Sequence, residues 1–194
     1  DVFVFTLGLT EAWMDRRDGA VFPLAPGVAG GRFDDSIHCF HNFDVAETVA
    51  DMDAAFAMIR ERNPAARFLV TVSPVPLNAT ALPRHIWVST SYSKAVLRVA
   101  AEQICAAWEK TDYFPSYEII TSPHVRGRYF AADGREVMEA GVEHVMRTFL
   151  HHYGTAPAAV SAAEPAPAPE DTHLAEMERI VKVLCDEEAI SNSA

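Results

Sequence analysis

The sequence lacks the motifs that indicate a membrane-spanning helix or a common nucleotide-binding site. No uninterrupted apolar run approaches the roughly 18 residues that a membrane-spanning helix needs. Neither common Gly-rich phosphate loop is present, and there is no Gly-x-Ser-x-Gly turn of the kind that carries a hydrolase nucleophile. These absences favour a globular protein that spans no membrane and whose chemistry has no local signature.

Positive charge and cysteine are also scarce. The formal net charge is −11, which argues against binding to the phosphate backbone of a nucleic acid. The three cysteines, Cys39, Cys105 and Cys185, are odd in number and far apart, so they do not form a disulfide framework. We therefore expect no nucleic-acid partner. The cysteines indicate either a reducing compartment or simple packing, and we expect a cytoplasmic location.

Near-continuous apolar runs predict strands that are covered on both faces. Residues 2–7 (VFVFTL) form one such run, and residues 67–76 (RFLVTVSPVP) contain another. Runs of this kind are typical of parallel strands between layers of helices. A third strand is expected over residues 112–120 (DYFPSYEII), although Pro115 interrupts it.

Helical periodicity alternates with these strands. One helix is expected after Asn42, with Asp44 and Glu47 in a capping arrangement, and others from Ser91 and from about Val137. The apolar positions that define the three helices are Val45, Val49, Met52, Phe56 and Ile59; Leu97, Ala101, Ile104 and Trp108; and Val142, Val145, Met146 and Phe149. The alternation predicts an α/β layered domain.

Composition divides the chain into three parts. Residues 1–153 are predicted to form the α/β domain, with residues 13–43 as a long Gly- and Pro-containing loop. Residues 154–170 (GTAPAAVSAAEPAPAPE) are predicted to be a linker that cannot build a core. Residues 171–194 are predicted to form an amphipathic helix and tail, which either docks on the domain or binds a protein partner. Its apolar positions are Leu174, Met177, Ile180, Val181 and Leu184.

Ligands of open parallel sheets bind beyond the carboxyl ends of the strands. Three segments lie at the carboxyl ends of the expected strands: residues 8–11, residues 73–76, and Tyr117 with Glu118. They should therefore share one edge of the sheet, which we call the rim. The segment HCFHNF (38–43) leaves that rim, and the polar loop 131–137 can return to it.

Each candidate at this rim has a functional and a structural interpretation. The Gly8 N–H and the Thr10 hydroxyl are candidate oxyanion donors, or else ordinary turn residues. His41 and Asn42 are candidate active-site lining, although Asn42 could equally satisfy backbone groups before the helix. Asp133 either caps the last helix or orients a catalytic histidine.

Metal and nucleophile signals are weak. His38, Cys39 and His41 lack the second paired group that a zinc site requires. No cofactor motif is present, and we expect no cofactor. Ser73, Ser93 and Cys39 are candidate nucleophiles by residue type alone.

Several short segments together carry a resemblance. In order they are TLGLTEAW (6–13), FHNF (40–43), NP (63–64), TVSPVPLNAT (71–80), YSKAVLR (92–98), YFPSYEII (113–120) and a D-x-R…GV…VM…F pattern within 133–149. With this order and spacing, residues 1 to about 150 resemble the GSCFA-domain family, which belongs to the SGNH/GDSL hydrolase-like group.

The resemblance implies a flavodoxin-like three-layer α/β/α domain, here N-terminally incomplete, with esterase or acyltransferase activity on a small-molecule or glycan ester such as acylated polysaccharide. In that family the nucleophile is expected in a Gly-Ser-Cys-Phe-Ala stretch, which this sequence does not contain. TLGLTE matches a later strand and turn that carry an oxyanion-hole residue. The resemblance therefore places the nucleophile upstream of Asp1, and we expect the 194 residues alone to be inactive.

The family group also ends its active site with an Asp-x-x-His motif. The matching stretch runs from Asp133 to Glu136, so that Glu136 stands where the histidine would be. A carboxylate can accept a proton but cannot act as the neutral imidazole that relays it at neutral pH. His41 is then the first choice for the base.

Two other classes of function stay open. The domain could be a non-catalytic carbohydrate- or partner-binding module on a degenerate hydrolase fold, with Trp13, Trp87, Tyr113 and Tyr117 stacking on sugars or simply packing in the core. It could also be an interaction protein whose acidic C-terminal helix recruits a partner.

Overall fold

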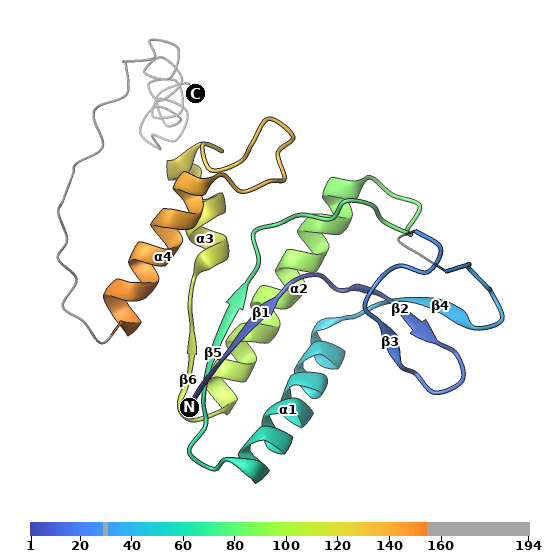
Figure 1. The fold of residues 1–194 in the computed structure, drawn as a ribbon, viewed down its shortest axis with the longest axis horizontal. Helices are drawn as coiled ribbons and strands as arrows, with labels where there is room; N and C mark the ends of the chain where they lie inside the picture. The colour runs from blue at the N-terminus through green and yellow to red at the C-terminus, as the bar shows by residue number, and fades with distance from the viewer. Residues whose placement is uncertain (29–30, 155–194) are drawn as a thin grey trace, which may run out of the picture. The chain divides into compact units, whose positions relative to one another are not determined.

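The computed structural model describes residues 1–28 and 31–154 (Figure 1). Its elements in chain order are β1 (Val2–Leu7), β2 (Glu11–Asp15), β3 (Val21–Phe22), β4 (His38–Asn42), α1 (Val45–Arg62), β5 (Arg67–Val72), α2 (Ile86–Ala107), β6 (Thr111–Tyr113), α3 (Ser116–Thr121), a 3₁₀ turn (Pro123–Val125) and α4 (Glu139–Tyr153). The predicted linker (154–170), apart from Gly154, and the predicted C-terminal helix (171–194) lie outside the described residues.

The central sheet is parallel, with the strand order β1-β5-β6. Val2 pairs with Arg67 at one end of the β1–β5 ladder, and Leu7 pairs with Val72 at the other. Helices α1 and α2 lie on one side of this sheet, and α3 and α4 lie on the other (Figure 1). The expected three-layer α/β/α architecture with a parallel sheet is therefore confirmed.

The main core lies between the sheet and the pair α1 and α2. Phe56 of α1 stacks on Phe68 of β5 with ring centroids 3.8 Å apart, and Phe5 and Trp108 contact the edges of this pair. Its buried members are Met52, Phe56, Ala66, Phe68, Val70, Ala101 and Ile104. Met52, Phe56, Ala101 and Ile104 are among the side chains that the apolar spacing of the two helices predicts to face inward.

The first helix begins as its sequence predicts. The Asp44 side chain accepts a hydrogen bond from the Glu47 N–H, and the Glu47 carboxylate accepts one from the Asp44 N–H. This reciprocal pair satisfies two backbone donors that a helix N-terminus leaves open. Asn63 ends the helix one residue before Pro64.

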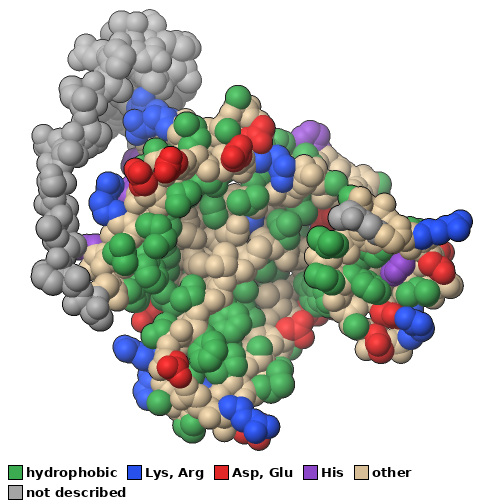
Figure 2. All heavy atoms as spheres, in the orientation of Figure 1, with side chains coloured by type: hydrophobic (Ala, Val, Ile, Leu, Met, Phe, Trp, Pro, Cys, Tyr) green, Lys and Arg blue, Asp and Glu red, His purple; other side chains and the backbone are tan. Residues whose placement is uncertain are grey.

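The opposite side of the sheet is less completely covered. Gly141 lets α4 approach its neighbours, because a Cβ there would lie 2.9 Å from Tyr129 Cβ and 3.0 Å from Ile120 Cδ1. Farther along α4, Val142, Met146 and Leu150 are exposed at a spacing of four residues. Figure 2 shows hydrophobic side chains gathered on the face where α4 and β1 lie.

The expected loop at residues 13–43 carries a second, antiparallel sheet with the strand order β3-β2-β4. Trp13 pairs with Phe40 in the β2–β4 ladder, and the segment predicted as the end of the loop is β4 itself. The prediction of a loop was wrong because pairing between segments so far apart leaves no short-range signal among glycines and prolines.

The third strand is also shorter than predicted. Only Thr111–Tyr113 pair with β5, and residues 116–120, which were predicted to belong to the same strand (112–120), lie in α3. Pro115 stands at the N-cap of that helix, where its missing N–H costs nothing. None of the helices in the described ranges is long and apolar enough to cross a bilayer.

Candidate active site

The turn after β1 is bound to three other elements. The buried Thr10 N–H donates to Ser93 Oγ of α2 (2.8 Å), and the Thr10 hydroxyl donates to Asn42 Oδ1 of β4 (2.7 Å). The Thr10 carbonyl accepts the N–H of Phe43 (2.9 Å). Thr10 and Asn42 are thus brought into contact across 32 residues of sequence. Since Thr10 occupies Asn42 Oδ1, the amide NH₂ of Asn42 is left as the donor end of that side chain.

Gly8 lies at the exposed part of the same turn. A Cβ at this position would meet nothing within 4 Å. Its carbonyl accepts a hydrogen bond from Lys94 Nζ (2.8 Å), whereas within the described residues its N–H donates to no partner. The glycine therefore leaves open space beside a free backbone donor at the carboxyl end of β1.

Lys94 is a member of the site that sequence reasoning missed. It is only 3% exposed, and no carboxylate of the described residues lies within ion-pair distance of it. Removal from water lowers the pKa of Lys94 to about 8. The sequence places Lys94 on the helix face that also carries Leu97 and Ala101. An apolar side chain usually occupies such a position, so a lysine there is the one sequence feature that could have indicated a buried cation.

His41 is directed toward the start of α1. Its Nε2 lies 3.0 Å from Glu47 Oε1, and its ring contacts that of Phe43 edge-on. Glu47 thus serves the helix cap with one oxygen and the imidazole with the other. A carboxylate that holds an imidazole is the arrangement that orients a histidine base. The sequence pattern predicted Glu47 only as a capping residue of the helix.

The loop that carries Asp133 and Glu136 returns to the sheet's carboxyl edge. Asp133 Oδ1 accepts the N–H groups of Arg135 and Glu136, and these bonds hold the pKa of Asp133 below its usual value. The Arg135 guanidinium donates to Asn78 Oδ1 (2.7 Å) and to the Pro76 carbonyl (3.4 Å), which lie after β5. The side chains of Asp133 and Glu136 are exposed. The structure gives no contact between these two residues and either His41 or Thr10.

A cavity of about 430 Å³ opens at this edge of the sheet. Its walls come from the segment after β5, from the first half of α2, from α3 and from residues 127–134. Lys94 lies in its wall, and Trp87 and Gly134 line one side, where a Cβ added at Gly134 would lie 3.9 Å from Trp87 Cζ2. The volume falls within the range of roughly 300–1,000 Å³ that small-molecule sites occupy.

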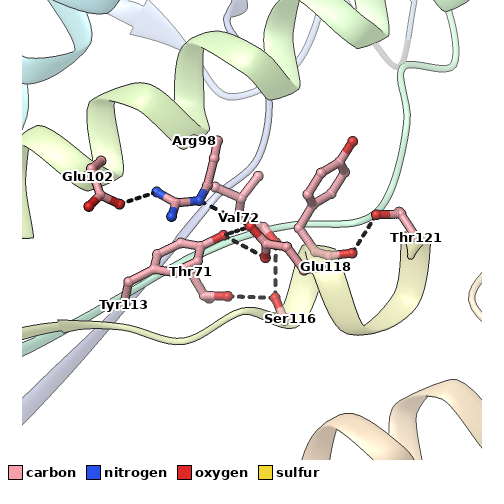
Figure 3. Close-up of polar contacts among 9 residues, drawn as sticks. Thr71, Val72, Arg98, Glu102, Tyr113, Ser116, Glu118 and Thr121 are labelled. Carbon is pink, nitrogen blue, oxygen red and sulfur yellow. Dashed lines mark hydrogen bonds and ion pairs between the residues drawn. The ribbon is translucent and has the colours of Figure 1, made fainter. Parts of the chain in front are cut away.

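A polar network fixes the α3 wall of the cavity (Figure 3). Arg98 of α2 binds Glu118 of α3, and the Tyr113 hydroxyl donates to both oxygens of the same carboxylate. Burial together with this carboxylate raises the pKa of Tyr113. Ser116 donates to the Val72 carbonyl and bonds Thr71. The network ties α3 to both β5 and β6, and so determines where Tyr117, Ile120 and Thr121 line the cavity.

The three side chains considered for zinc do not converge. His38 packs against Phe22 and Phe33, whereas His41 faces Phe43 and Glu47. The Cys39 thiol donates to the Met14 carbonyl. In the part of the chain that the structure describes, no group of three His, Cys, Asp or Glu side chains is arranged to hold a metal ion.

The nucleophile candidates within the chain are poorly placed. Ser93 is fully buried, and its Oγ accepts the Thr10 N–H. Ser73 Oγ accepts the N–H of Val75 in its own turn. Both hydroxyl oxygens thus accept hydrogen bonds from backbone N–H groups.

Comparison with known proteins supplies the family. A model of the GSCFA family matches residues 1–149, which is most of the chain and includes every site residue named above. The chain belongs to the GSCFA family. No curated protein and no solved structure matches it. The family assignment thus rests on the same residues that form the fold and the cavity.

Proposed function

We propose that this GSCFA-family chain supplies the larger part of the active site of an SGNH-like acyl hydrolase or acyltransferase, acting on an ester substrate such as an acylated polysaccharide. The observation that carries the proposal is the turn at Gly8–Thr10, which Ser93, Lys94 and Asn42 hold beside a cavity at the carboxyl edge of a parallel sheet. This edge is where the sheets of α/β proteins bind their ligands.

The turn provides donors for an oxyanion. The Gly8 N–H and the NH₂ group of Asn42 are the two groups we assign to this role. Thr10 fixes the orientation of Asn42 by occupying its oxygen. Preorganised donors of this kind stabilise the charge that develops on a carbonyl oxygen during acyl transfer.

The serine nucleophile is assigned to a further strand that pairs with the open edge of β1. β1 is an edge strand of the order β1-β5-β6, so one row of its backbone N–H and C=O groups is open to pairing with a further strand. A parallel strand added there would end beside Gly8, and its following residue would face the oxyanion donors. This assignment agrees with the nucleophile-bearing stretch that the family resemblance implies.

The base is His41, oriented by Glu47 at 3.0 Å. Asp133 and Glu136, which match the Asp-x-x-His motif, lie on a loop whose Arg135 bonds the segment after β5. They are assigned to the rim of the substrate site. A histidine base contributes about 10²–10⁴-fold to acyl transfer.

Hydrolysis of p-nitrophenyl acetate by the gene product that contains these 194 residues tests the proposal. His41→Ala should lower kcat/KM at least about a hundredfold, and the matched exposed substitution His124→Ala should leave it within twofold. Lack of turnover of simple esters by the parent protein would contradict an esterase.

The backbone donor has its own test. Gly8→Pro removes the N–H, whereas Gly8→Ala retains it and adds a Cβ where the structure has room. The proline variant should lose about 10²–10³-fold in kcat, and the alanine variant should retain activity. Equal activity of the two variants would remove the Gly8 N–H from the mechanism.

A non-catalytic sugar-binding module is the second candidate, favoured by Trp87, which lines the cavity and is 53% exposed. Trp13 and Tyr113 do not support it, because Trp13 packs on Phe33 and Phe40 and Tyr113 lies under Arg98. Glycan-array binding without ester turnover would favour this function over the hydrolase.

The finer assignments on location and partner belong with this proposal. A reducing, cytoplasmic environment fits the unpaired thiols of Cys39 and Cys105. The acidic helix predicted in residues 171–194 is assigned to a protein partner, so deletion of residues 154–194 should abolish capture of that partner and leave the fold intact.

A further inference from the structure

The cavity at the carboxyl edge of the sheet combines apolar walls with one buried cation. Its apolar lining includes Pro74, Pro76, Trp87, Ile120 and Phe130, and Lys94 is the one charged residue in the lining. Such a surface suits a ligand that is mostly hydrocarbon and carries one polar, electron-rich end.

The state of Lys94 points to what that end is. Its Nζ has three donors, of which one goes to the Gly8 carbonyl, and the described residues supply no carboxylate partner. A buried ammonium is normally paired, because an uncompensated charge in an apolar environment is costly. An anionic oxygen of a ligand would therefore complete the pairing of Lys94.

The same hydrogen bond connects the cavity with the oxyanion turn. Lys94 Nζ is 2.8 Å from the carbonyl of Gly8, whose own N–H is the assigned oxyanion donor. A ligand whose polar end lies at Lys94 therefore has that end next to the turn and its apolar part directed toward Trp87 and Ile120.

We propose that the cavity binds the acyl chain of a carboxylate or ester, with the carboxylate or carbonyl oxygen at Lys94 and the chain against Trp87 and Ile120. The lining also carries the hydroxyls of Thr90, Ser91, Tyr117 and Thr121, but Lys94 is its one cation. A single ammonium in a mostly apolar wall favours a monoanion with a hydrocarbon tail over a phosphate, which several converging charged donors bind best. The inference deepens the proposed function by naming the acyl group's site, yet it is tested by equilibrium binding without turnover.

The first experiment is calorimetric titration of the 194-residue protein with butanoate, hexanoate and octanoate, and with 1-octanol as the uncharged control. Affinity should rise about fourfold per added methylene, which corresponds to about 0.8 kcal/mol for each buried CH₂, until the chain fills the cavity. Octanoate should bind at least tenfold more tightly than octanol. Equal affinity for the two, or tighter binding of inorganic phosphate than of octanoate, would overturn the proposal.

Two variants separate the cation from the apolar wall. Lys94→Met removes the charge at similar length and should weaken octanoate at least tenfold while leaving octanol within twofold, and the exposed Lys110→Met should change neither. Ala131→Trp fills the cavity from its lining and should weaken the binding of both octanoate and octanol. This variant tests the site if Lys94→Met does not fold. Unchanged octanoate binding in either cavity variant would place the ligand elsewhere.

The two proposals fail in different ways. Octanoate binding that depends on Lys94, together with no ester hydrolysis, retains the acyl site and removes the enzyme. Ester hydrolysis that is indifferent to Lys94→Met and Ala131→Trp retains the enzyme and removes this acyl site.

Discussion

The two sides of the parallel sheet differ in how completely helices cover them. On the α1 and α2 side, Phe56 and Phe68 stack inside a sealed core and are 0% and 2% exposed. The α3 and α4 side carries a helix with an exposed apolar row, and the carboxyl edge of the sheet, between α3 and the first half of α2, borders a cavity whose buried Lys94 has no carboxylate partner among the described residues. Stability is therefore concentrated on the α1 and α2 side, and groups without a partner among the described residues lie where a ligand or a neighbouring segment can reach them.

The largest effect should come from breaking the sealed side. Phe56→Ala removes the stacked ring from the core and should lower the free energy of unfolding by about 3–5 kcal/mol, measured by urea denaturation. Met58→Ala on the same helix and Met146→Ala on α4 change exposed side chains, and each should stay within about 0.5 kcal/mol of the parent. A Met146→Ala effect as large as that of Phe56→Ala would erase the contrast between the two sides.

The buried lysine gives the open side a distinctive pH dependence. The folded-state pKa of Lys94 is about 8 and its ordinary value is 10.5, so the unfolded chain binds more protons between these pH values. The penalty for burying the charge is fully present below pH 8 and disappears as the pH rises to 10.5. The parent should gain on the order of 3 kcal/mol relative to Lys94→Met across this window, since the difference between 10.5 and about 8, at about 1.4 kcal/mol per pKa unit, sets an upper value of about 3.5 kcal/mol.

Urea denaturation of the parent and Lys94→Met at several pH values measures this gain. Lys110→Met provides the control, because Lys110 is exposed and should give parallel stability curves. Parallel curves for Lys94→Met as well would contradict the burial of an unpaired charge.

A smaller effect is expected where α2 supports the turn after β1. Ser93→Ala leaves the buried Thr10 N–H without its acceptor and should cost about 1–3 kcal/mol. Ser91→Ala, two residues earlier on the exposed part of α2, should cost little. Hydrogen exchange of the Thr10 amide measures the effect at the site itself, and unchanged protection in Ser93→Ala would show that the bond does not hold the turn.

The smallest effect should come from the network that holds α3. Glu118→Gln weakens the bonds from Arg98 and Tyr113, and should lower stability by about 1 kcal/mol because the carboxylate is part of a network rather than an isolated surface pair. Glu102→Gln breaks the more exposed pair with the same arginine and should cost about 0.3–0.5 kcal/mol. Thermal unfolding at low and high salt compares the two, and equal costs would place Glu118 among ordinary surface charges.

The sequence predicted the elements whose signals are local. The apolar spacing from Val45 to Ile59 reports one buried face of a helix, and the capping pair at Asp44 and Glu47 marks its start. The run at residues 67–72 predicts a strand buried on both faces. By contrast, β2 and β4 are stabilised by pairing across a Gly- and Pro-rich segment, and residues 116–121 are helical despite aromatic and β-branched side chains that favour strands.

In the candidate site, too, some features could be predicted from local sequence patterns and others could not. The rule that ligands bind at the carboxyl ends of parallel strands predicted the edge of the sheet, and Thr10 and Asn42 do meet there. Periodicity places Lys94 on the helix face of Leu97 and Ala101, but not its contact, because its partner at Gly8 is 86 residues away and a lysine in a helix normally reaches solvent. Contacts of that kind are decided by how layers pack, which no local pattern encodes.

Adjacent residues of one helix, Ser93 and Lys94, hold both sides of the turn that contains Gly8 and Thr10. Ala101 and Ile104, farther along α2, lie in the main core and set the rotation of the helix. An α-helix rotates by about 100° per residue, so a single residue inserted between Lys94 and Ala101 would swing both anchors away from the turn together. The length of α2 between Lys94 and Ala101 is therefore fixed. The loops around the cavity can lengthen or shorten during divergence, whereas this stretch of helix can change only by substitution.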